Sequence, residues 1–294
     1  MTSWLWAVFT VIAAAAQTAR NAMQRELTAK LGTVGATHVR FLFGCPFALV
    51  FLAGVWIVKG TFPPQPGIAF WAWILAGALS QILATALMLA AMGERSFVVA
   101  IAYTKTEPVQ VALFGLAFLG DPLNAMTAAA ILLATAGVIV MSWKRGAGGG
   151  LWPVVLGISA GSMFALAAVG YRGAILALHT DFVMAATFTL AVGLTVQAVL
   201  LSAYLAMRTP AVLRAIVTAW RPSLFAGAMG AFASQFWFLA FALTSAANVR
   251  TLGLVEVLFA QGVSHLAFKQ PATPREALGI LLVVAGVVLL IWAQ

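Results

Sequence analysis

Charge, cysteine and histidine are all scarce in this sequence, and each shortage excludes a class of protein. Charged residues make up 8% of the 294 residues, against roughly 25% in a typical soluble domain, which excludes a water-soluble fold. The single cysteine, Cys45, excludes an intramolecular disulfide. The 16 lysines and arginines are scattered through apolar sequence, so they form no basic face and predict no nucleic-acid partner. The three histidines, His38, His179 and His265, are isolated from one another and predict no metal site.

Apolar residues dominate what remains. They make up 63% of the chain, and a helix that crosses a bilayer needs about 20 of them. Long runs without alternation are not typical of barrel strands, so the predicted fold is an all-α integral membrane protein. Met1 to Trp6 lack the positive charge that opens a cleaved signal peptide, so we expect the first helix to be retained. Breaks at glycine, proline and charge clusters predict ten transmembrane helices, at residues 3–28, 33–58, 68–92, 97–119, 123–143, 151–177, 181–206, 222–244, 248–268 and 274–293.

The two halves of the chain resemble each other. A shift of 149 positions (256 − 107 = 149) aligns Glu107 with Glu256 and, without gaps, Pro122 with Pro271. A glycine-rich stretch near the midpoint indicates a flexible linker. Because five is an odd number, the second five-helix repeat would enter the membrane from the opposite side, and the two inverted repeats are expected to enclose a central cavity. The predicted parts are an N-terminal repeat at 1–145, a linker at 146–150 and a C-terminal repeat at 151–294.

Loop charges predict the orientation. The loops after the odd-numbered helices carry ten lysines and arginines, whereas those after the even-numbered helices carry only Lys59. This positive-inside bias places the odd-numbered loops in the cytoplasm and both termini outside. On the outer side, Asp181 is expected to open the seventh helix, where a carboxylate suits the helix dipole.

Two glutamates are predicted deep in the membrane, Glu107 in the fourth helix and Glu256 in the ninth. A charge at that depth costs about 2.5–3.5 kcal/mol or more, so each needs a partner, water or a function. Helical spacing places Tyr103 and Gln110 on the face of Glu107, while Pro108 predicts a kink there. These residues would bind a substrate amine or carry a coupling proton. The alternative is that each glutamate is a neutral or paired interhelical contact.

Polar side chains also follow one face of the first helix. Gln17 and Asn21 are predicted to line the cavity, whereas Arg20 and Gln24 could instead snorkel to the interface. In the eighth helix, Trp237 is predicted either to form a wall of the binding site or to serve ordinary packing. The candidate site therefore has residues from both repeats.

Four more cations, Arg40, Lys105, Arg172 and Arg250, lie within predicted helices. Beside a cavity they would act as gate latches or attract carboxylates and phosphates. Snorkelling to the lipid headgroups is the alternative, and we expect it for all but Lys105. Lys105 and Glu107 are two residues apart, so their side chains point in different directions and need not pair.

Small residues at regular spacing predict close helix packing. Terminal helices of each repeat also offer contact faces for a second subunit, so monomer and homodimer both stay open. The small-residue positions are Gly157 and Gly161 in the sixth helix, Ala130 and Gly137 in the fifth, and Gly279 and Gly286 in the tenth.

Several motifs together resemble the drug/metabolite transporter superfamily, specifically its ten-helix EamA-type members. They are Glu107-Pro108, Leu119-Gly120-Asp121 and Ala136-Gly137-Val138, with a second copy at Glu256 and Ala285-Gly286-Val287. Within the superfamily the chain is most similar to bacterial aromatic amino acid exporters. The resemblance implies export of amino acids, including aromatic or other apolar ones, and of related small metabolites and some cationic drugs across the cell inner membrane, through a central cavity between the halves. The inverted repeats predict alternating access, and the loop charges predict that both termini are periplasmic.

Other functions stay open at this point. An exchanger of phosphorylated metabolites or nucleotide sugars would need Lys105 or Arg40 in the cavity, and export of cationic drugs is a further alternative. An enzyme is not expected, because the chain has no HExxH, GxSxG or Walker A motif. We expect no cofactor, and the bilayer and a small-molecule solute as partners. The predicted substrate-binding residues are Gln17, Asn21, Tyr103, Glu107, Gln110, Trp237 and Glu256.

Overall fold

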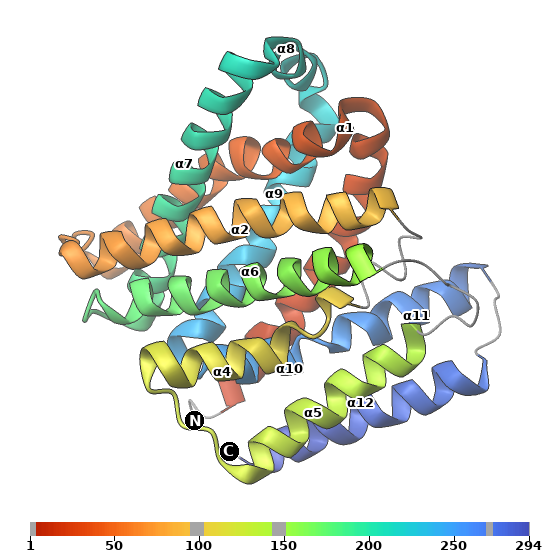
Figure 1. Cartoon of the computed structure of the whole chain (residues 1–294). Coiled ribbons are helices and arrows are strands. Elements are labelled where there is room, and N and C mark those ends of the chain that lie inside the picture. Colours follow the sequence, from red (N-terminus) through yellow and green to blue (C-terminus); the bar gives the residue numbers. More distant parts are fainter. Residues whose placement is uncertain (1–3, 95–102, 143–150, 269–272, 294) are drawn as a thin grey trace. The chain divides into compact units, whose positions relative to one another are not determined.

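The computed structural model describes residues 4–94, 103–142, 151–268 and 273–293, and within these ranges the chain is helical and contains no strand (Figure 1). Among these described residues, six helices are long and apolar enough to cross a membrane, and shorter apolar helices lie at Leu5–Arg20, Glu107–Leu119 and Ala125–Met141. The all-α prediction is confirmed for the described part, while the count of ten spans and the inverted topology stay predictions. The helices are α1 (Leu5–Lys59), α2 (Ile68–Glu94), α4 (Glu107–Leu119), α5 (Ala125–Ser142), α6 (Leu151–Leu176), α7 (Phe182–Arg208), α8 (Pro210–Thr218), α9 (Trp220–Leu243), α10 (Ala246–Leu252), α11 (Val255–Phe268) and α12 (Pro274–Trp292).

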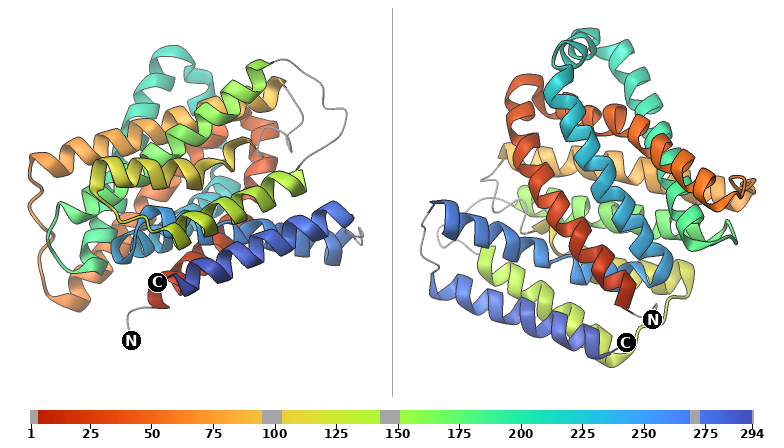
Figure 2. Two further views of the ribbon diagram at one scale, coloured as in Figure 1. Left: turned by 60° about the horizontal axis from the view of Figure 1, so that its bottom comes forward. Right: turned by 180° about the vertical axis from the view of Figure 1, so that it is seen from behind.

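The first two predicted helices form one kinked element. α1 bends at Gly32, whose φ of 66° and ψ of 179° are non-helical and lie in a region that favours glycine. Figure 2 shows the two segments of α1 running in different directions from this bend. The break predicted between residues 28 and 33 is therefore a kink without an intervening loop.

Three other predicted boundaries were wrong. The fourth and ninth predicted helices are interrupted, because turns at Lys105–Thr106 and Gly253–Leu254 precede α4 and α11. A loop was predicted between residues 206 and 222, but the short helix α8 lies there. The segment forms a helix because one of its sides is apolar and packs on the protein: Ile216 is fully buried with residues of α1, α7 and α9.

The helices form two compact units, and each combines segments from both halves of the sequence. Unit 1 contains Met1–Leu79 and Gly170–Leu243, and unit 2 contains Ser80–Val169 and Thr244–Gln294. Helices α2 and α6 each contribute to both units. A sequence repeat is thus not a compact unit in this fold.

In unit 1, both segments of α1 pack against α9, as the right view of Figure 2 shows. Glycine makes the approach possible. A Cβ at Gly227 would lie 2.5 Å from the Cβ of Phe43 and 2.8 Å from its carbonyl oxygen, so any larger residue would force the two backbones apart. α7 rises to α8, and α9 returns alongside α7 (Figure 1).

In unit 2, α5 and α12 lie side by side along small residues (Figures 1 and 2). A Cβ at Gly137 would lie 2.7 Å from the carbonyl oxygen of Gly279, and one at Gly286 would lie 2.6 Å from the backbone nitrogen of Ala134. The predicted close packing of these faces is confirmed. Because the two small-residue faces cover each other, they are not available to a second subunit.

Candidate functional site

The helix break at Lys105–Thr106 follows from Pro108. Proline lacks an N–H group and its ring clashes with the carbonyl of residue i−4, here Thr104, so it kinks or breaks a helix at this point. In the first turn of a helix proline is tolerated, and α4 begins at Glu107 with Thr106 as its N-cap. The kink predicted at Pro108 is a complete break.

The second break, at Gly253–Leu254, contains no proline, and Gly253 keeps right-handed helical dihedrals, with φ −58° and ψ −18°. Through this turn backbone N–H groups donate to the carbonyl three residues earlier. Leu254 N donates to Thr251 O at 3.1 Å, and Glu256 N donates to Gly253 O at 3.1 Å. α11 then begins at Val255, with Glu256 in its first turn. Each glutamate therefore lies at the start of a helix that begins after a break.

Two ion pairs connect these breaks within unit 2. Arg250 Nε, from α10, lies 3.0 Å from Glu107 Oε1 at the start of α4. The second pair reverses the halves of the sequence that supply cation and acid: Lys105, from the first break, pairs with Glu256 Oε1 at the start of α11. Each glutamate thus takes its cation from the other half of the sequence. We call Lys105, Glu107, Arg250 and Glu256 the paired-charge cluster.

The cluster carries two positive and two negative charges that are largely removed from water. The four side chains are 11–20% exposed, and a charge at low exposure in a membrane protein needs a partner. The N-terminal ends of α4 and α11 add a favourable dipole for the glutamates. Within the cluster, the charges sum to zero.

These contacts decide several sequence predictions. The paired alternative for Glu107 and Glu256 is confirmed, and Lys105 pairs with Glu256 rather than with its neighbour Glu107. The snorkelling expected for Arg250 was wrong, because the carboxylate of Glu107 is within reach. The sequence carried one signal for these pairs: each intramembrane acid has a cation a few residues before it in the same predicted helix.

Tyr103 and Gln110 lie on either side of the first break, joined through Thr106. The hydroxyl of Thr106 donates to Tyr103 O at 2.8 Å and accepts a hydrogen bond from Gln110 Nε2 at 3.1 Å. Gly161 brings α6 close, since a Cβ there would lie 3.2 Å from Thr104 O and 3.6 Å from Gln110 Oε1. Tyr103, Glu107, Gln110 and Glu256 therefore all belong to unit 2.

The remaining predicted residues belong to unit 1. Trp237 Nε1, on α9, donates to Gln17 Oε1, on α1, at 3.2 Å. The indole of Trp237 is stacked with Phe241, with ring centroids 6.4 Å apart and an interplanar angle of 26°. The ring of Trp237 is therefore packed and its N–H has a specific acceptor, while its part in a binding site stays a prediction. The side chain of Asn21 lies outside the described part of the structure.

Two arginines of α1 approach the same glycine of α9. A Cβ at Gly230 would lie 3.4 Å from Arg40 Cγ and 3.5 Å from Arg20 Cδ. Arg20 is only 7% exposed, so the interfacial snorkelling considered for it does not occur. We call Arg20 and Arg40 the arginine pair.

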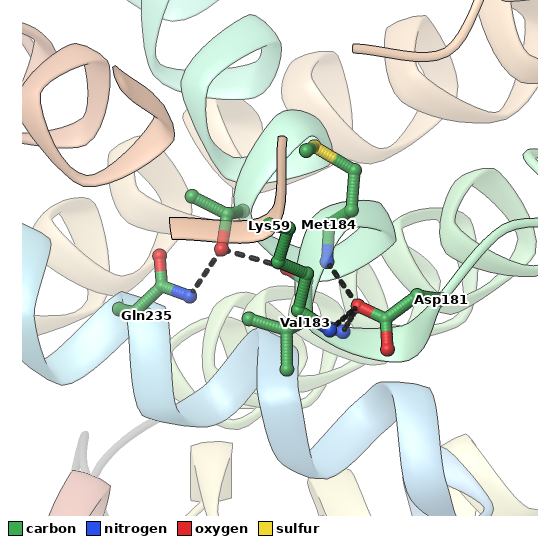
Figure 3. Close-up of polar contacts among 6 residues, drawn as sticks. Lys59, Asp181, Val183, Met184 and Gln235 are labelled. Carbon is green, nitrogen blue, oxygen red and sulfur yellow. Dashed lines mark hydrogen bonds and ion pairs between the residues drawn. The ribbon is translucent and has the colours of Figure 1, made fainter. Parts of the chain in front are cut away.

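On another part of unit 1, Lys59 Nζ lies 2.6 Å from Asp181 Oδ2 (Figure 3). The same oxygen accepts hydrogen bonds from the backbone nitrogens of Val183 at 3.1 Å and Met184 at 3.2 Å, which confirms Asp181 as the N-cap of α7. Burial acts to raise the pKa of Asp181, but the Lys59 ammonium and the two backbone N–H groups outweigh it and leave the pKa below its ordinary 3.8.

A metal ion would need several ligating side chains at one place. Among the residues that the structure describes, no group of three or more His, Cys, Asp or Glu side chains is close enough to hold one.

Residues 4–143 and again residues 151–292 match the EamA-like transporter family. The chain belongs to this family. The two matched segments end 149 residues apart (292 − 143 = 149), so the predicted two-repeat sequence is confirmed. Members of the family are transporters rather than enzymes, and with its apolar helices the chain is a multi-pass membrane protein.

The EamA fold is also seen in a solved structure described as "Crystal structure of protein". It superposes with a TM-score of 0.71 over 100% of this chain and 99% of the other, at 14% sequence identity. At that identity the likeness shows a shared fold and nothing about the solute. No curated protein matches the chain.

Proposed function

We propose that this EamA-family transporter exports amino acids, including aromatic or other apolar ones, and related small metabolites across the cell inner membrane by alternating access. The loops after odd-numbered spans would lie in the cytoplasm and both termini in the periplasm, as the loop charges indicate. The proposal for the solute rests on one observation, the pair of reciprocal ion pairs at the two helix breaks of unit 2.

The charge balance of the cluster favours a zwitterionic solute. An α-amino acid can replace both partners of an ion pair, with its ammonium group on Glu107 or Glu256 and its carboxylate on Arg250 or Lys105. Because it brings no net charge, every charge in the cluster keeps a partner during the exchange. A solute with only a cation or only an anion would leave one internal charge without compensation in a medium of low dielectric constant, which is costly. This argument disfavours cationic drugs as the main solutes.

The helix breaks support the same proposal. Interrupted transmembrane helices leave backbone groups available for solutes at the depth of the break, and such breaks are typical of binding sites in transporters. We propose that Tyr103 and Gln110 beside the first break, and Gln17, Asn21 and Trp237 in unit 1, complete the set of solute-binding residues with Glu107 and Glu256. The stacked rings of Trp237 and Phe241 support a preference for aromatic or apolar side chains.

One observation favours a second candidate, exchange of phosphorylated metabolites or nucleotide sugars. Phosphate recognition uses fixed cations with several donors, and the two residues of the arginine pair come from the two segments of α1 with their side-chain stems beside the same glycine, Gly230. Lys105 gives this candidate less support, because its ammonium group is paired with Glu256.

Transport by reconstituted protein tests the proposal. Proteoliposomes would be assayed for uptake of labelled amino acids and sugar phosphates, with and without an imposed pH gradient. We expect uptake of L-phenylalanine by the wild type and a loss of at least about tenfold in Glu107→Gln, Tyr103→Ala and Trp237→Ala. Arg214→Gln is the control, because it removes one exposed charge of α8. Undiminished uptake in all three variants would reject the site, and uptake of sugar phosphates alone would establish the second candidate.

A further inference from the structure

The short helix α8 joins two membrane spans at one end of unit 1. It has nine residues and is therefore about 14 Å long, whereas the hydrocarbon core of a bilayer is about 30 Å thick. The helices on either side of it, α7 and α9, are both long and apolar enough to cross a membrane. Figure 1 shows α8 between the end of α7 and the start of α9. α8 therefore lies at a membrane surface and does not cross the membrane.

One side of α8 is packed and the other is exposed. Ile216 is fully buried, and Val212 and Leu213 pack beside it against residues of α1, α7 and α9. Helical spacing places these three side chains on one side of α8. Arg214 and Thr218 share the opposite side and are both exposed. The packed side thus fixes α8 on unit 1, and the other side is available to a partner.

Three exposed arginines lie at this end of unit 1. Arg208 is the last residue of α7, Arg214 lies in α8 and Arg221 is the second residue of α9. The sequence contains no acidic residue from position 182 to position 255. Within the described ranges, no ion pair joins any of these three side chains to a carboxylate. Three positive charges are thus presented together without an acidic partner in the described part of the protein.

At the other end of α7 the charges are balanced. The N-cap of α7 is Asp181, which pairs with Lys59 (Figure 3). The 27 residues of α7 extend about 40 Å, which is enough to separate its two ends by the thickness of a bilayer core. The unbalanced arginines therefore belong to one membrane surface, and the balanced pair belongs to the other.

Aromatic side chains accompany two of the arginines. Tyr204 is 49% exposed and lies one helical turn before Arg208, on the same face of α7. Trp220 is 51% exposed, and the guanidinium carbon of Arg221 lies 5.4 Å from the centre of its ring. Tyrosine and tryptophan favour the membrane interface because they combine an apolar ring with a polar group. Exposed rings beside exposed cations are therefore typical of residues at the level of the lipid headgroups.

We propose that this end of unit 1 binds the headgroups of anionic phospholipids. We call its exposed residues, Tyr204, Arg208, Arg214, Trp220 and Arg221, the α8 surface. A guanidinium group donates to phosphate oxygens through several N–H groups, and an anionic leaflet attracts basic residues that lie close to it. A bilayer offers a separate headgroup to each arginine, so the three side chains need not converge on one point.

The aromatic residues favour a lipid over a soluble anion as the partner. A soluble polyanion would neutralise the arginines but leave the rings of Tyr204 and Trp220 in water, whereas a lipid supplies a phosphate for the cations and acyl chains for the rings. The proposal concerns the lipid around the protein. It therefore goes beyond the proposed transport function and holds whichever solute is carried.

Titration of the purified protein in detergent tests the α8 surface. The probes are phosphatidylglycerol, which is anionic, phosphatidylcholine, which has a phosphate but no net charge, and inorganic phosphate. The unfolding temperature is followed as each is added. We expect phosphatidylglycerol to raise it at lower concentrations than phosphatidylcholine does. Arg208→Gln, Arg214→Gln and Arg221→Gln should each weaken the apparent affinity for phosphatidylglycerol about fivefold, and the triple variant should no longer distinguish the two lipids.

Two further variants serve as controls. Arg275→Gln removes an exposed arginine of α12, in unit 2, and should bind phosphatidylglycerol as the wild type does. Replacement of all three arginines of the α8 surface by lysine keeps the charge and should keep most of the affinity. If the triple glutamine variant does not fold, the three single variants decide, because each removes only one exposed side chain.

Three results would overturn the proposal. In the first, the glutamine variants respond to phosphatidylglycerol as the wild type does. In the second, Arg275→Gln loses as much affinity as they do, which would indicate a general effect of charge. In the third, inorganic phosphate stabilises the protein through the same arginines as strongly as phosphatidylglycerol does, which would assign the surface to a soluble anion. None of these results depends on the solute, so the proposed function would still be decided by uptake.

Discussion

Arg250 Nε lies 3.0 Å from Glu107 Oε1, although the two residues belong to different sequence repeats. The reciprocal pair, Lys105 with Glu256, crosses between the repeats in the opposite sense. The two glutamates are equivalent positions under the 149-residue shift, but their cations are not. Repetition of sequence has thus produced a pair of equivalent acids, and the fold has supplied a different cation to each.

Removing one partner of the Glu107–Arg250 pair is expected to destabilise the protein more than removing both. Glu107→Gln or Arg250→Gln leaves a charge of low exposure without its partner, which costs about 3–5 kcal/mol. The double variant leaves no such charge, so we expect it to recover most of that loss. Unfolding of the four proteins in detergent measures the coupling. Additive effects of the two substitutions would show that the ion pair does not contribute.

A methyl group at Gly137 is expected to open the contact between α5 and α12. In Gly137→Ala the new Cβ would meet the backbone of Gly279 and Val283 at 2.7 Å, and backbone atoms cannot move aside as a flexible side chain can. We expect a loss of about 1–3 kcal/mol, the usual cost of overpacking. Gly54→Ala is the matched control, since a Cβ there has nothing within 4 Å. Equal unfolding temperatures for the two variants would argue against close packing at Gly137.

The contacts of Asp181 predict a pH dependence of stability. Because its pKa is lower in the folded protein than its ordinary 3.8, the contacts stabilise the fold above that value. Their contribution is lost as the pH falls through the folded pKa. Asp181→Ala removes both the cap and the ion pair and should cost about 1 kcal/mol near neutral pH, whereas Lys59→Gln removes only the ion pair and should cost less. Unfolding measured between pH 7 and pH 3 should show the wild type approaching Asp181→Ala at the acid end. A difference that stays constant over that range would contradict the assignment.

Much of the fold could be predicted from the sequence because a membrane restricts the choices. Backbone groups in hydrocarbon must be satisfied within the helix, so long apolar runs indicate helices, and the bounds of α2, α6 and α7 agree with prediction to within a few residues. Close packing at Gly137 and at Gly279 was also predictable, because small residues at regular spacing indicate close approach of a neighbouring helix, but not that these two glycines face each other. The cap at Asp181 followed from its place at the start of a helix.

The breaks and the ion pairs were harder to predict because they depend on tertiary contacts. Pro108 indicated a kink, but nothing local at Gly253 distinguishes a break from an ordinary helical glycine. The partner of Glu107 lies 143 positions away in sequence (250 − 107 = 143), and periodicity within one helix carries no information about it. The compact units were likewise not evident, because each is assembled from both repeats.

Uptake of labelled L-phenylalanine by the Glu107→Gln/Arg250→Gln double variant tests the central claim most directly, because this variant removes the ion pair without leaving an unpaired charge. If the paired-charge cluster binds the zwitterion, the double variant should fold but take up at most about one tenth of the label that the wild type takes up in the same proteoliposomes. Uptake at the wild-type rate would mean that the pair serves only to join the broken helices, and would contradict the proposed role in solute binding.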